Sequence, residues 1–486
     1  MLGKAIDKYK NMPRIVKASM WFLICSFLQK GISFITTPIF TRLMTTAEYG
    51  NYNVYVSWLG IVTIIVTLNL SSGVYTQSLV KFDQERNVIS SSLQGLTLTM
   101  VSAWTIIYLF FQDFWNQILS LSTIQVLSML VTIWATAAFG FWATEQRVKL
   151  NYKSLVCITV ISSILQPVIS ILAVKQSADK VTARILTVAV IQVMIYVWLF
   201  VYQICKGKRF YSRKFWLYAL SFNIPLIPHY LSQTLLNSAD RIMIDRMSGA
   251  SEAGIYSLAY SIANIMILFN TALLQTMNPW IYQKIKNREE KDIAGIAYST
   301  LILIAIVNLM LIAFSPEIVY IFAPPKYSDA IWVIPPIAMS VYFIFAYSLF
   351  ADFEFYYKKT KFIMAASVLS ALTNIVLNYV FIKIFGYMAA GYTTLFCYIV
   401  YAIAHYFCMV HVCKEKMEGA KVYEPKYLLG ITGSFIGIGF ILSLTYYNSF
   451  IRYAAVLLIF ATLIINFKRI KKIIMNTISQ LRSQAS

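Results

Sequence analysis

The sequence predicts an all-α polytopic membrane protein of about fourteen transmembrane helices, with two pseudo-symmetric six-helix lobes in a parallel repeat and two further C-terminal helices. Three observations predict this fold. Hydrophobic residues make up 59% of the 486 residues and charged residues only 13%, whereas about a quarter of the residues in a soluble domain are charged. The apolar residues form stretches of about 20, enough for a helix to cross a bilayer. A motif that follows the first stretch recurs after the seventh.

The predicted helices follow one another along the whole chain, separated by short polar segments. The first lobe is expected over residues 1–208, the second over 209–413, and the last helices with a basic tail over 414–486. The spans of the first lobe are expected near 15–40, 50–72, 88–111, 117–140, 154–174 and 182–204. The later spans are expected near 215–239, 253–277, 293–315, 330–351, 361–383, 388–411, 427–446 and 450–467. The first span lacks a small-residue cleavage site and is interpreted as an uncleaved helix.

The distribution of Lys and Arg predicts the orientation. With both termini in the cytoplasm, most of the 41 Lys and Arg fall in cytoplasmic loops and tails, as the positive-inside rule requires. A missed helix would invert every later loop, so this bias also supports an even number of helices. The net charge of +21 is therefore interpreted as charge at the membrane surface, and no nucleic-acid partner is expected.

The recurring motif supports duplication of the chain. "RLMTTAEYGNY" at Arg42–Tyr52 aligns without a gap with "RMSGASEAGIY" at Arg246–Tyr256. The fifth and eleventh spans also correspond, because "VISSILQPVIS" from Val160 resembles "VLSALTNIVLN" from Val368 in polarity. Six helices per copy keep both copies in the same orientation, which gives a repeat axis along the membrane normal.

The motif itself favours a structural role at the outer rim. Thr45 and Glu48 have the spacing of a helix capping box, and Gly249 and Glu252 occupy the matching places in the second copy. Glu48 and Glu252 are therefore expected to bond the free amides of a helix start rather than a ligand. Two further groups are expected at the same rim, namely Arg42 with Arg246, and Asp240 with Asp245.

Two stripes of polar side chains predict a hydrated cavity between the lobes. Each stripe repeats at steps of three or four residues, which places its members on one helix face. The first span carries Ser26, Lys30, Ser33 and Thr37, and the seventh carries His229, Gln233, Asn237 and Arg241. Tyr260 and Asn264 are added from one face of the eighth span, although ordinary helix packing is the better explanation for any one such side chain.

Lys30 is the most informative member of these stripes. A charge near the centre of a membrane helix costs about 3 kcal/mol on insertion scales, so such residues usually face a wet cavity. Lys30 is expected to face the cavity because at least about 15 Å separates it from either end of its span, which is beyond easy snorkelling reach. Arg241 is evenly balanced between a substrate contact and an ion cluster with Asp240 and Asp245.

The chain shows no constellation for catalysis or metal binding. The six cysteines lack metal-ligand partners and are interpreted as core residues. The longest polar segments, near 282–292 and 414–426, carry mixed charges without a nucleotide motif. A membrane polysaccharide polymerase, which would gather acid or base residues in a large outer loop, is disfavoured. No cofactor is expected, and a coupling ion, Na⁺ or H⁺, stays open.

Four segments carry a family resemblance. The segments are "TRLMTTAEYGNYNVY", "SADRIMIDRMSGASEAGIYSLAYSIAN", "FAPPKYSDAIWVIPPIA" and "FGYMAAGYTTLFCY". Together they resemble bacterial polysaccharide exporters of the multidrug/oligosaccharidyl-lipid/polysaccharide (MOP) superfamily, and more narrowly the Wzx-type flippases for capsule or O-antigen repeat units.

The resemblance implies two six-helix lobes around a central cavity and a substrate of undecaprenyl diphosphate carrying a short oligosaccharide. This substrate would move across the bacterial cytoplasmic (inner) membrane by alternating access, with membrane lipids, a polysaccharide polymerase and chain-length machinery as candidate partners. Lipid II flippases of the superfamily typically have several arginines in the cavity, whereas here Lys30 is the one cation expected near the middle of the membrane. Cation-coupled drug exporters would want a membrane carboxylate, and the first span has none.

Overall fold

The computed structural model describes residues 12–465, which form helices without any strand. Because a bilayer offers no water to backbone groups, helices that satisfy their own hydrogen bonds are the expected solution. In this part of the chain, eleven helices are long and apolar enough to cross a membrane. The chain is a multi-pass membrane protein. The basic tails at residues 1–11 and 466–486 lie outside the described residues.

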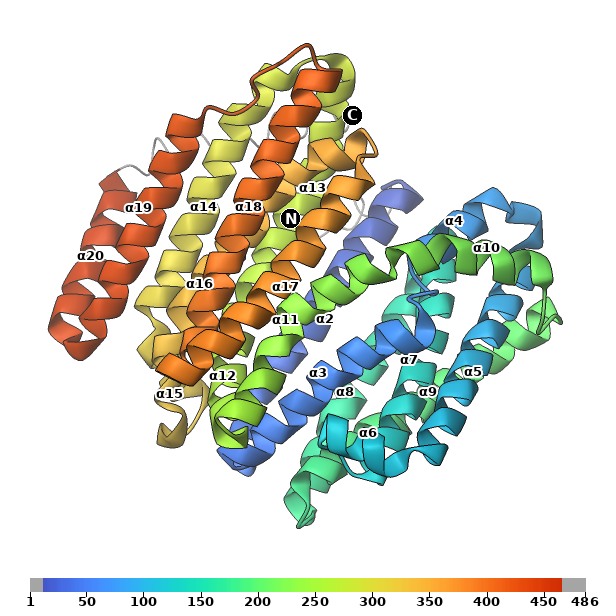
Figure 1. Cartoon of the computed structure of the whole chain (residues 1–486). Helices are drawn as coiled ribbons and strands as arrows, with labels where there is room; N and C mark the ends of the chain where they lie inside the picture. The colour runs from blue at the N-terminus through green and yellow to red at the C-terminus, as the bar shows by residue number, and fades with distance from the viewer. Residues whose placement is uncertain (1–11, 466–486) are drawn as a thin grey trace. The chain divides into compact units, whose positions relative to one another are not determined.

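Contacts divide the chain into two compact units, unit 1 at Met1–Ile242 and unit 2 at Met243–Ser486. The helices of unit 1 are α2 (Arg14–Leu43), α3 (Thr46–Thr67), α4 (Gly73–Lys81), α5 (Arg86–Phe110), α6 (Gln112–Leu119), α7 (Thr123–Val148), α8 (Tyr152–Gln176), α9 (Lys180–Gly207), α10 (Arg213–Asn223) and most of α11 (Ile227–Met247). The core of this unit forms where α7 packs along α9 and α9 along α5 and α8 (Figure 1).

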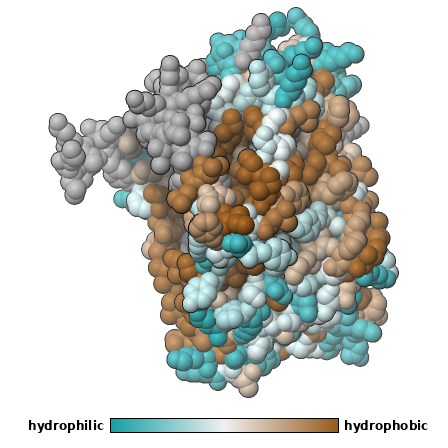
Figure 2. All heavy atoms as spheres, turned by 90° about the vertical axis from the view of Figure 1, so that its left-hand side faces the viewer, coloured by the Kyte–Doolittle hydropathy of each residue, from teal (hydrophilic) through white to brown (hydrophobic). Residues whose placement is uncertain are grey.

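Unit 2 begins within α11 and continues through a second set of helices. They are α12 (Ala250–Ala263), α13 (Ile265–Asn287), α14 (Ile293–Ala313), α15 (Ser315–Phe322), α16 (Ala330–Tyr356), α17 (Thr360–Phe385), α18 (Ala389–Lys416), α19 (Pro425–Leu444) and α20 (Ser449–Ile465). Helix α16 is its central element, packing against α12, α13, α14 and most extensively α18. On the face where α19 and α20 lie, hydrophobic side chains form a broad belt between hydrophilic ends (Figure 2).

The predicted seventh and eighth spans are each divided into two helices. A short 3₁₀ turn at Ile224–Leu226 separates α10 from α11, where Pro225 removes a backbone donor. Asn264 interrupts the eighth span between α12 and α13. The fourth span begins later than expected, at Thr123, because Ser120 adopts a left-handed conformation after the short helix α6. Helices α3, α10, α11 and α20 occupy predicted spans but are not among the eleven apolar ones.

The boundary between the units lies further along the chain than the predicted lobe boundary at residue 208. Helix α10 packs against α4 and α5 of unit 1. Trp216 Nε1 donates to Ser92 O at 2.9 Å, and Asn223 Nδ2 donates to Leu68 O at 2.7 Å. These bonds fasten the start of the second sequence repeat to the first unit.

Candidate functional site: a polar cavity in unit 1

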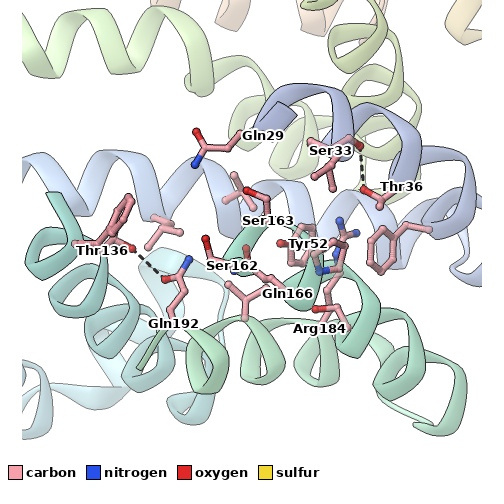
Figure 3. Close-up of a pocket in the computed structure, with 18 of the residues that line it drawn as sticks. Gln29, Ser33, Thr36, Tyr52, Thr136, Ser162, Ser163, Gln166, Arg184 and Gln192 are labelled. Carbon is pink, nitrogen blue, oxygen red and sulfur yellow. Dashed lines mark hydrogen bonds between the residues drawn. The ribbon is translucent and has the colours of Figure 1, made fainter. Parts of the chain in front are cut away.

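A cavity of about 460 Å³ lies within unit 1, lined by side chains of α2, α3, α7, α8 and α9. Figure 3 shows its polar side chains directed into the space between these helices. Hydroxyl and amide groups predominate among them, and they come from Gln29, Ser33, Thr36, Thr136, Ser162, Ser163, Gln166, Ser170 and Gln192. Such groups in a membrane helix bundle mark a hydrated surface, because an apolar bilayer gives them no partners.

Aromatic rings complete the lining of the cavity. Phe40 and Tyr52 lie at one end, and Phe139 with Tyr196 lie elsewhere in the wall. The rings of Phe139 and Tyr196 are stacked with centroids 4.6 Å apart. A surface that combines ring faces with hydroxyl and amide groups suits a ligand that has both apolar faces and many hydroxyls.

Three hydroxyl groups of the cavity donate hydrogen bonds to the protein itself. Thr36 Oγ1 donates to Ser33 O at 3.0 Å, and Thr136 Oγ1 donates to Gln192 Oε1 at 3.0 Å (Figure 3). Ser162 Oγ donates to Thr159 O at 3.0 Å. Bonds of a hydroxyl to a carbonyl three or four residues earlier satisfy the donor and leave the oxygen lone pairs able to accept. The wall can therefore accept hydrogen bonds from ligand hydroxyls.

The charge of the lining is one-sided. Among the residues that line this cavity, Arg184 is charged and no Asp or Glu is present. The Arg184 guanidinium carbon lies 3.5 Å from the ring centroid of Phe40 and 3.6 Å from that of Tyr52. A cationic ligand would meet no counter-ion in this lining, whereas an anionic ligand would meet Arg184. A neutral polyhydroxyl ligand needs no counter-ion.

The predicted stripe on the first span lies beside this cavity rather than along its centre. Ser33 lines the cavity together with Gln29 and Thr36. Side chains advance by about 100° per residue around a helix, so Lys30 lies about a quarter turn from Gln29. Lys30 and Ser26 are exposed, and Thr37 is half-buried. The hydroxyls of Ser26 and Thr37 donate to Phe22 O and Ser33 O.

The predicted stripe on the seventh span lies on α11, which contributes nothing to the lining of this cavity. His229, Gln233, Asn237 and Arg241 are all half-buried. Asn237 Nδ2 donates to Gln233 O at 2.8 Å, and Arg241 Nη1 contacts Ser57 Oγ at 3.4 Å. Asp240 is buried and Asp245 half-buried. The alternatives for Arg241, an ion cluster or a substrate contact, both stay predictions.

The other two predicted cavity residues lie in unit 2. In unit 2, Tyr260 is buried against Tyr256, with ring centroids 6.2 Å apart, and Asn264 is half-buried at the end of α12. That the two stripes and these residues line one space between the lobes stays a prediction.

The motif residues at the rim take structural positions. Thr45 and Glu48 form a capping box, with Thr45 N donating to Glu48 Oε2 at 2.7 Å and Glu48 N to Thr45 Oγ1 at 3.1 Å. In the second copy, Gly249 has φ +122° and a Cβ there would lie 3.0 Å from Glu252 Oε2. Arg42 and Arg246 are exposed at helix ends, and Arg42 Nη1 donates to Pro38 O.

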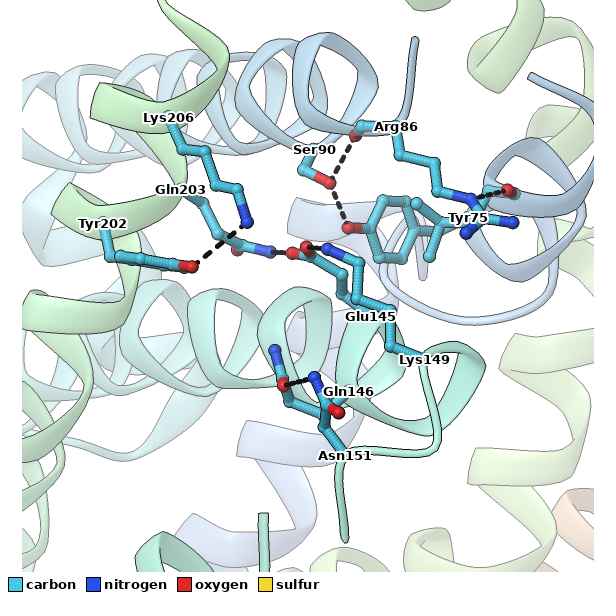
Figure 4. Close-up of polar contacts among 11 residues, drawn as sticks. Tyr75, Arg86, Ser90, Glu145, Gln146, Lys149, Asn151, Tyr202, Gln203 and Lys206 are labelled. Atoms are coloured by element: carbon cyan, nitrogen blue, oxygen red, sulfur yellow. Dashed lines mark hydrogen bonds and ion pairs between the residues drawn. The ribbon is translucent and has the colours of Figure 1, made fainter. Parts of the chain in front are cut away.

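A buried polar network holds the opposite end of unit 1 (Figure 4). Glu145, 2% exposed, pairs with Lys149 and accepts from Gln203 Nε2 at 2.7 Å. Gln94 Nε2 donates to Gln203 Oε1 at 2.7 Å, and Tyr75 OH lies 2.6 Å from Ser90 Oγ. The network ties together α4, α5, α7 and α9. Its carboxylate is already paired and lies at the far end of α9 from Arg184, so it serves as scaffold for the cavity.

Sequence reasoning missed Arg184, Gln166 and Gln192, which line the cavity. The signal for α8 was present, because Ser162, Ser163, Gln166 and Ser170 recur at helical steps in "SSILQPVIS". Arg184 could be interpreted only as one of several cations near a membrane surface. Its position between two rings from α2 and α3 is a tertiary feature.

Comparisons with known proteins place the chain in a family. Residues 15–284, more than half of the chain, match the family model described as polysaccharide biosynthesis protein, and residues 225–380 match the MatE model. No curated protein sequence matches the chain.

Solved structures show the same fold. A lipid II flippase, MurJ, in an inward closed conformation superimposes with a TM-score of 0.72 at 15% identity, covering 93% of this chain and 100% of its own. An inward-facing multidrug resistance MATE transporter superimposes with a TM-score of 0.64 at 13% identity, covering 80% of this chain and 96% of its own. A MOP superfamily transporter from Pyrococcus furiosus superimposes with a TM-score of 0.58 at 14% identity, covering 83% of this chain and 96% of its own. The chain therefore belongs to the polysaccharide biosynthesis protein family and has the fold of the MOP superfamily of membrane transporters.

Proposed function

We propose that the chain is a flippase that moves undecaprenyl-diphosphate-linked oligosaccharide repeat units across the bacterial cytoplasmic membrane, for capsule, O-antigen or other polysaccharide synthesis. The observation that carries this proposal is the acid-free polar cavity of unit 1, in which hydroxyl, amide and aromatic groups surround a single cation. The family match to polysaccharide biosynthesis proteins supports the same class of substrate.

The proposed mechanism is alternating access without chemistry on the substrate. The saccharide enters the cavity and exchanges water for the hydroxyl and amide groups of α2, α8 and α9, while the prenyl chain stays in lipid. Lys30, exposed beside the cavity on α2, is the proposed partner of the diphosphate. A charge pair there gains strength from the low dielectric of the surroundings.

A lipid II-type peptidoglycan precursor is the second candidate substrate. The structural likeness to a lipid II flippase over 93% of the chain favours it. Both candidates are polyprenyl diphosphates with a saccharide, and they differ in the sugars and in the peptide. A cationic drug is a poorer candidate because the cavity lining offers no carboxylate.

The substrate assignment is tested with purified protein in liposomes. A fluorescent undecaprenyl-diphosphate oligosaccharide is placed in both leaflets, and an impermeant reductant bleaches the outer one. We expect bleaching to continue past the outer-leaflet fraction only in liposomes that contain the protein. Preferential movement of lipid II would favour the second candidate. Movement of neither lipid, with efflux of a cationic dye, would contradict both.

The proposed orientation places both termini in the cytoplasm. Reporter fusions after residues 210 and 415 should give cytoplasmic signals, and fusions near 180 and 325 should give external ones. Arg184 and the adjoining end of the cavity would then lie toward the outer face. A reversed signal at any of the four positions would contradict the predicted number of spans.

A further inference from the structure

The Arg184 side chain is held in one place by aromatic rings from two other helices. Its guanidinium carbon lies 3.5 Å from the Phe40 ring centroid on α2 and 3.6 Å from the Tyr52 centroid on α3. Nearby, Lys180 Nζ donates to Leu43 O at 2.8 Å, which joins the start of α9 to the end of α2. Arg184 Nη1 also donates to Met44 Sδ at 3.7 Å. A guanidinium beside aromatic rings directs its N–H groups in its own plane, the arrangement that favours planar oxyanions.

A second polar group of the cavity has an incomplete hydrogen-bond set. Ser170 on α8 lines the cavity, is 2% exposed, and its Oγ has no hydrogen-bond partner among the described residues. A buried hydroxyl without a partner is costly, and a ligand in the cavity would supply one. The cavity therefore contains a fixed cation and an unsatisfied hydroxyl.

The position of Arg184 is separate from that of Lys30. Arg184 stacks on Phe40, which follows Lys30 on the same helix. The rise of an α-helix places these two α2 positions about 15 Å apart along its axis. The two cations therefore belong to different levels along α2. A ligand that has its diphosphate at Lys30 would bring its saccharide to Arg184.

We propose that the cavity of unit 1 selects a saccharide that carries an acidic group, a hexuronate or another acid-substituted sugar, with Arg184 pairing the acid and Ser170 bonding an adjacent oxygen. This inference rests on the proposed function and adds the chemical class of the sugar. In this proposal the guanidinium of Arg184 donates charge-assisted N–H hydrogen bonds to the carboxylate. The lining contains no acid that would repel such a ligand. The oxyanion recognised at Arg184 belongs to the sugar, and the diphosphate is bound elsewhere.

Binding to the purified full-length protein tests the inference. The probes are trigalacturonate, its carboxyl-reduced neutral counterpart and inorganic pyrophosphate, measured by calorimetry. We expect trigalacturonate to bind about tenfold more tightly than the neutral trimer, the ratio given by one charge-assisted contact. Arg184→Gln should abolish this preference, Arg184→Lys should keep part of it, and Ser170→Ala should weaken binding with the fold intact. Lys175→Gln, an exposed cation on α8 outside the lining, is the matched control.

Several outcomes would overturn the inference. Equal binding of the acidic and neutral trimers by the parent protein would do so, as would an acid preference that survives in Arg184→Gln. Competition by pyrophosphate that is lost in Arg184→Gln would assign the site to the diphosphate instead. If Arg184→Gln fails to fold, Arg184→Lys still separates the cases, since it should reduce the acid preference, whereas Ser170→Ala should weaken the binding of both trimers. An unchanged acid preference in Arg184→Lys together with unchanged binding in Ser170→Ala would overturn the inference.

Analysis of the exported polymer in the source bacterium distinguishes this inference from the proposed function. A polymer that depends on this protein for export and contains an acidic sugar supports both. If a polymer that needs this protein for its export contains only neutral sugars, the acid site would be overturned, and the proposed flippase function would be unaffected. Movement of no lipid-linked saccharide in liposomes would contradict the flippase itself.

Discussion

The two units have related sequences but use their corresponding helices differently. In unit 1 the fourth predicted span, α7, lines an open polar cavity through Thr136 and Phe139. In unit 2 the corresponding helix, α16, is buried along most of its length. Helix α2 of unit 1 is largely exposed by contrast. The corresponding helices therefore differ in their surroundings, since α7 borders a polar cavity in unit 1 and α16 forms the packed core of unit 2.

The same contrast appears in the buried carboxylates near the ends of α7 and α16. Glu145 in unit 1 pairs with the half-exposed Lys149 and with Gln203. Glu354 in unit 2 lies 2.7 Å from His405 Nδ1, and both side chains are fully buried. The rings of Tyr347 and Tyr401 cover this histidine. A partly exposed ion pair tolerates loss of one member better than an enclosed pair does.

The largest effect is expected in unit 2, at the enclosed pair. His405→Ala should lower the free energy of unfolding by about 3–5 kcal/mol, because it leaves Glu354 buried without its partner. Denaturation of the purified protein measures the change. The control is Lys359→Ala, which removes a pair with the partly exposed Glu415 and should cost about 1 kcal/mol or less. Equal effects of the two substitutions would contradict the contrast between enclosed and exposed pairs.

A smaller effect is expected where α9 approaches α5 in unit 1. A Cβ at Gly207 would lie 2.1 Å from Asn87 O, so the two backbones must separate. Gly207→Ala should destabilise the protein by about 1–3 kcal/mol, the usual range for overpacking. Gly437→Ala on α19 is the control, because no atom lies within 4 Å of its added Cβ. A neutral Gly207→Ala would show that the two helices adjust without loss.

The two copies of the motif should differ at the helix start. Thr45→Ala removes the side-chain half of the capping box and should cost about 1 kcal/mol. Gly249→Thr gives the second copy the residue that the first copy has at the matching position. This substitution should also destabilise the protein, because φ is +122° there and a side chain is strained in that conformation. Thermal unfolding of both variants measures this. Stabilisation by Gly249→Thr would show that the second copy can adopt the same cap.

The smallest effect on stability, with a large effect on transport, is expected at Lys30. Lys30 is exposed on α2, so Lys30→Ala should leave abundance and unfolding unchanged. Export should be lost and lipid-linked oligosaccharide should accumulate in the cytoplasmic leaflet, because the diphosphate loses its cation. Lys30→Arg should keep part of the activity. If Lys30→Ala is present at normal abundance and exports normally, the diphosphate contacts other residues, and the function assigned to the α2 stripe is contradicted.

Sequence periodicity predicted a cavity between the lobes, and one residue of the predicted stripe on the first span lines the cavity within unit 1 instead. Ser33 lies at helical spacing from other hydroxyls, and it does line the cavity. Periodicity could not give the rotation of α2 about its axis, which places Gln29 and Thr36 in the wall and Lys30 beside it. That rotation depends on packing against α8, to which α2 makes most of its contacts within unit 1.

The sequence by itself determined the helical membrane fold, the approximate spans and the family. These follow from apolar length and from motifs, which are local properties of the chain. The cap at Thr45 and Glu48 was likewise local and was readable from four residues. The tertiary structure decided which helices enclose the cavity, and it placed Arg184 of α9 between Phe40 of α2 and Tyr52 of α3. It also joined Glu354 to His405, 51 positions apart. Such contacts depend on how helices pack, and helical periodicity carries no information about which neighbour a face will meet.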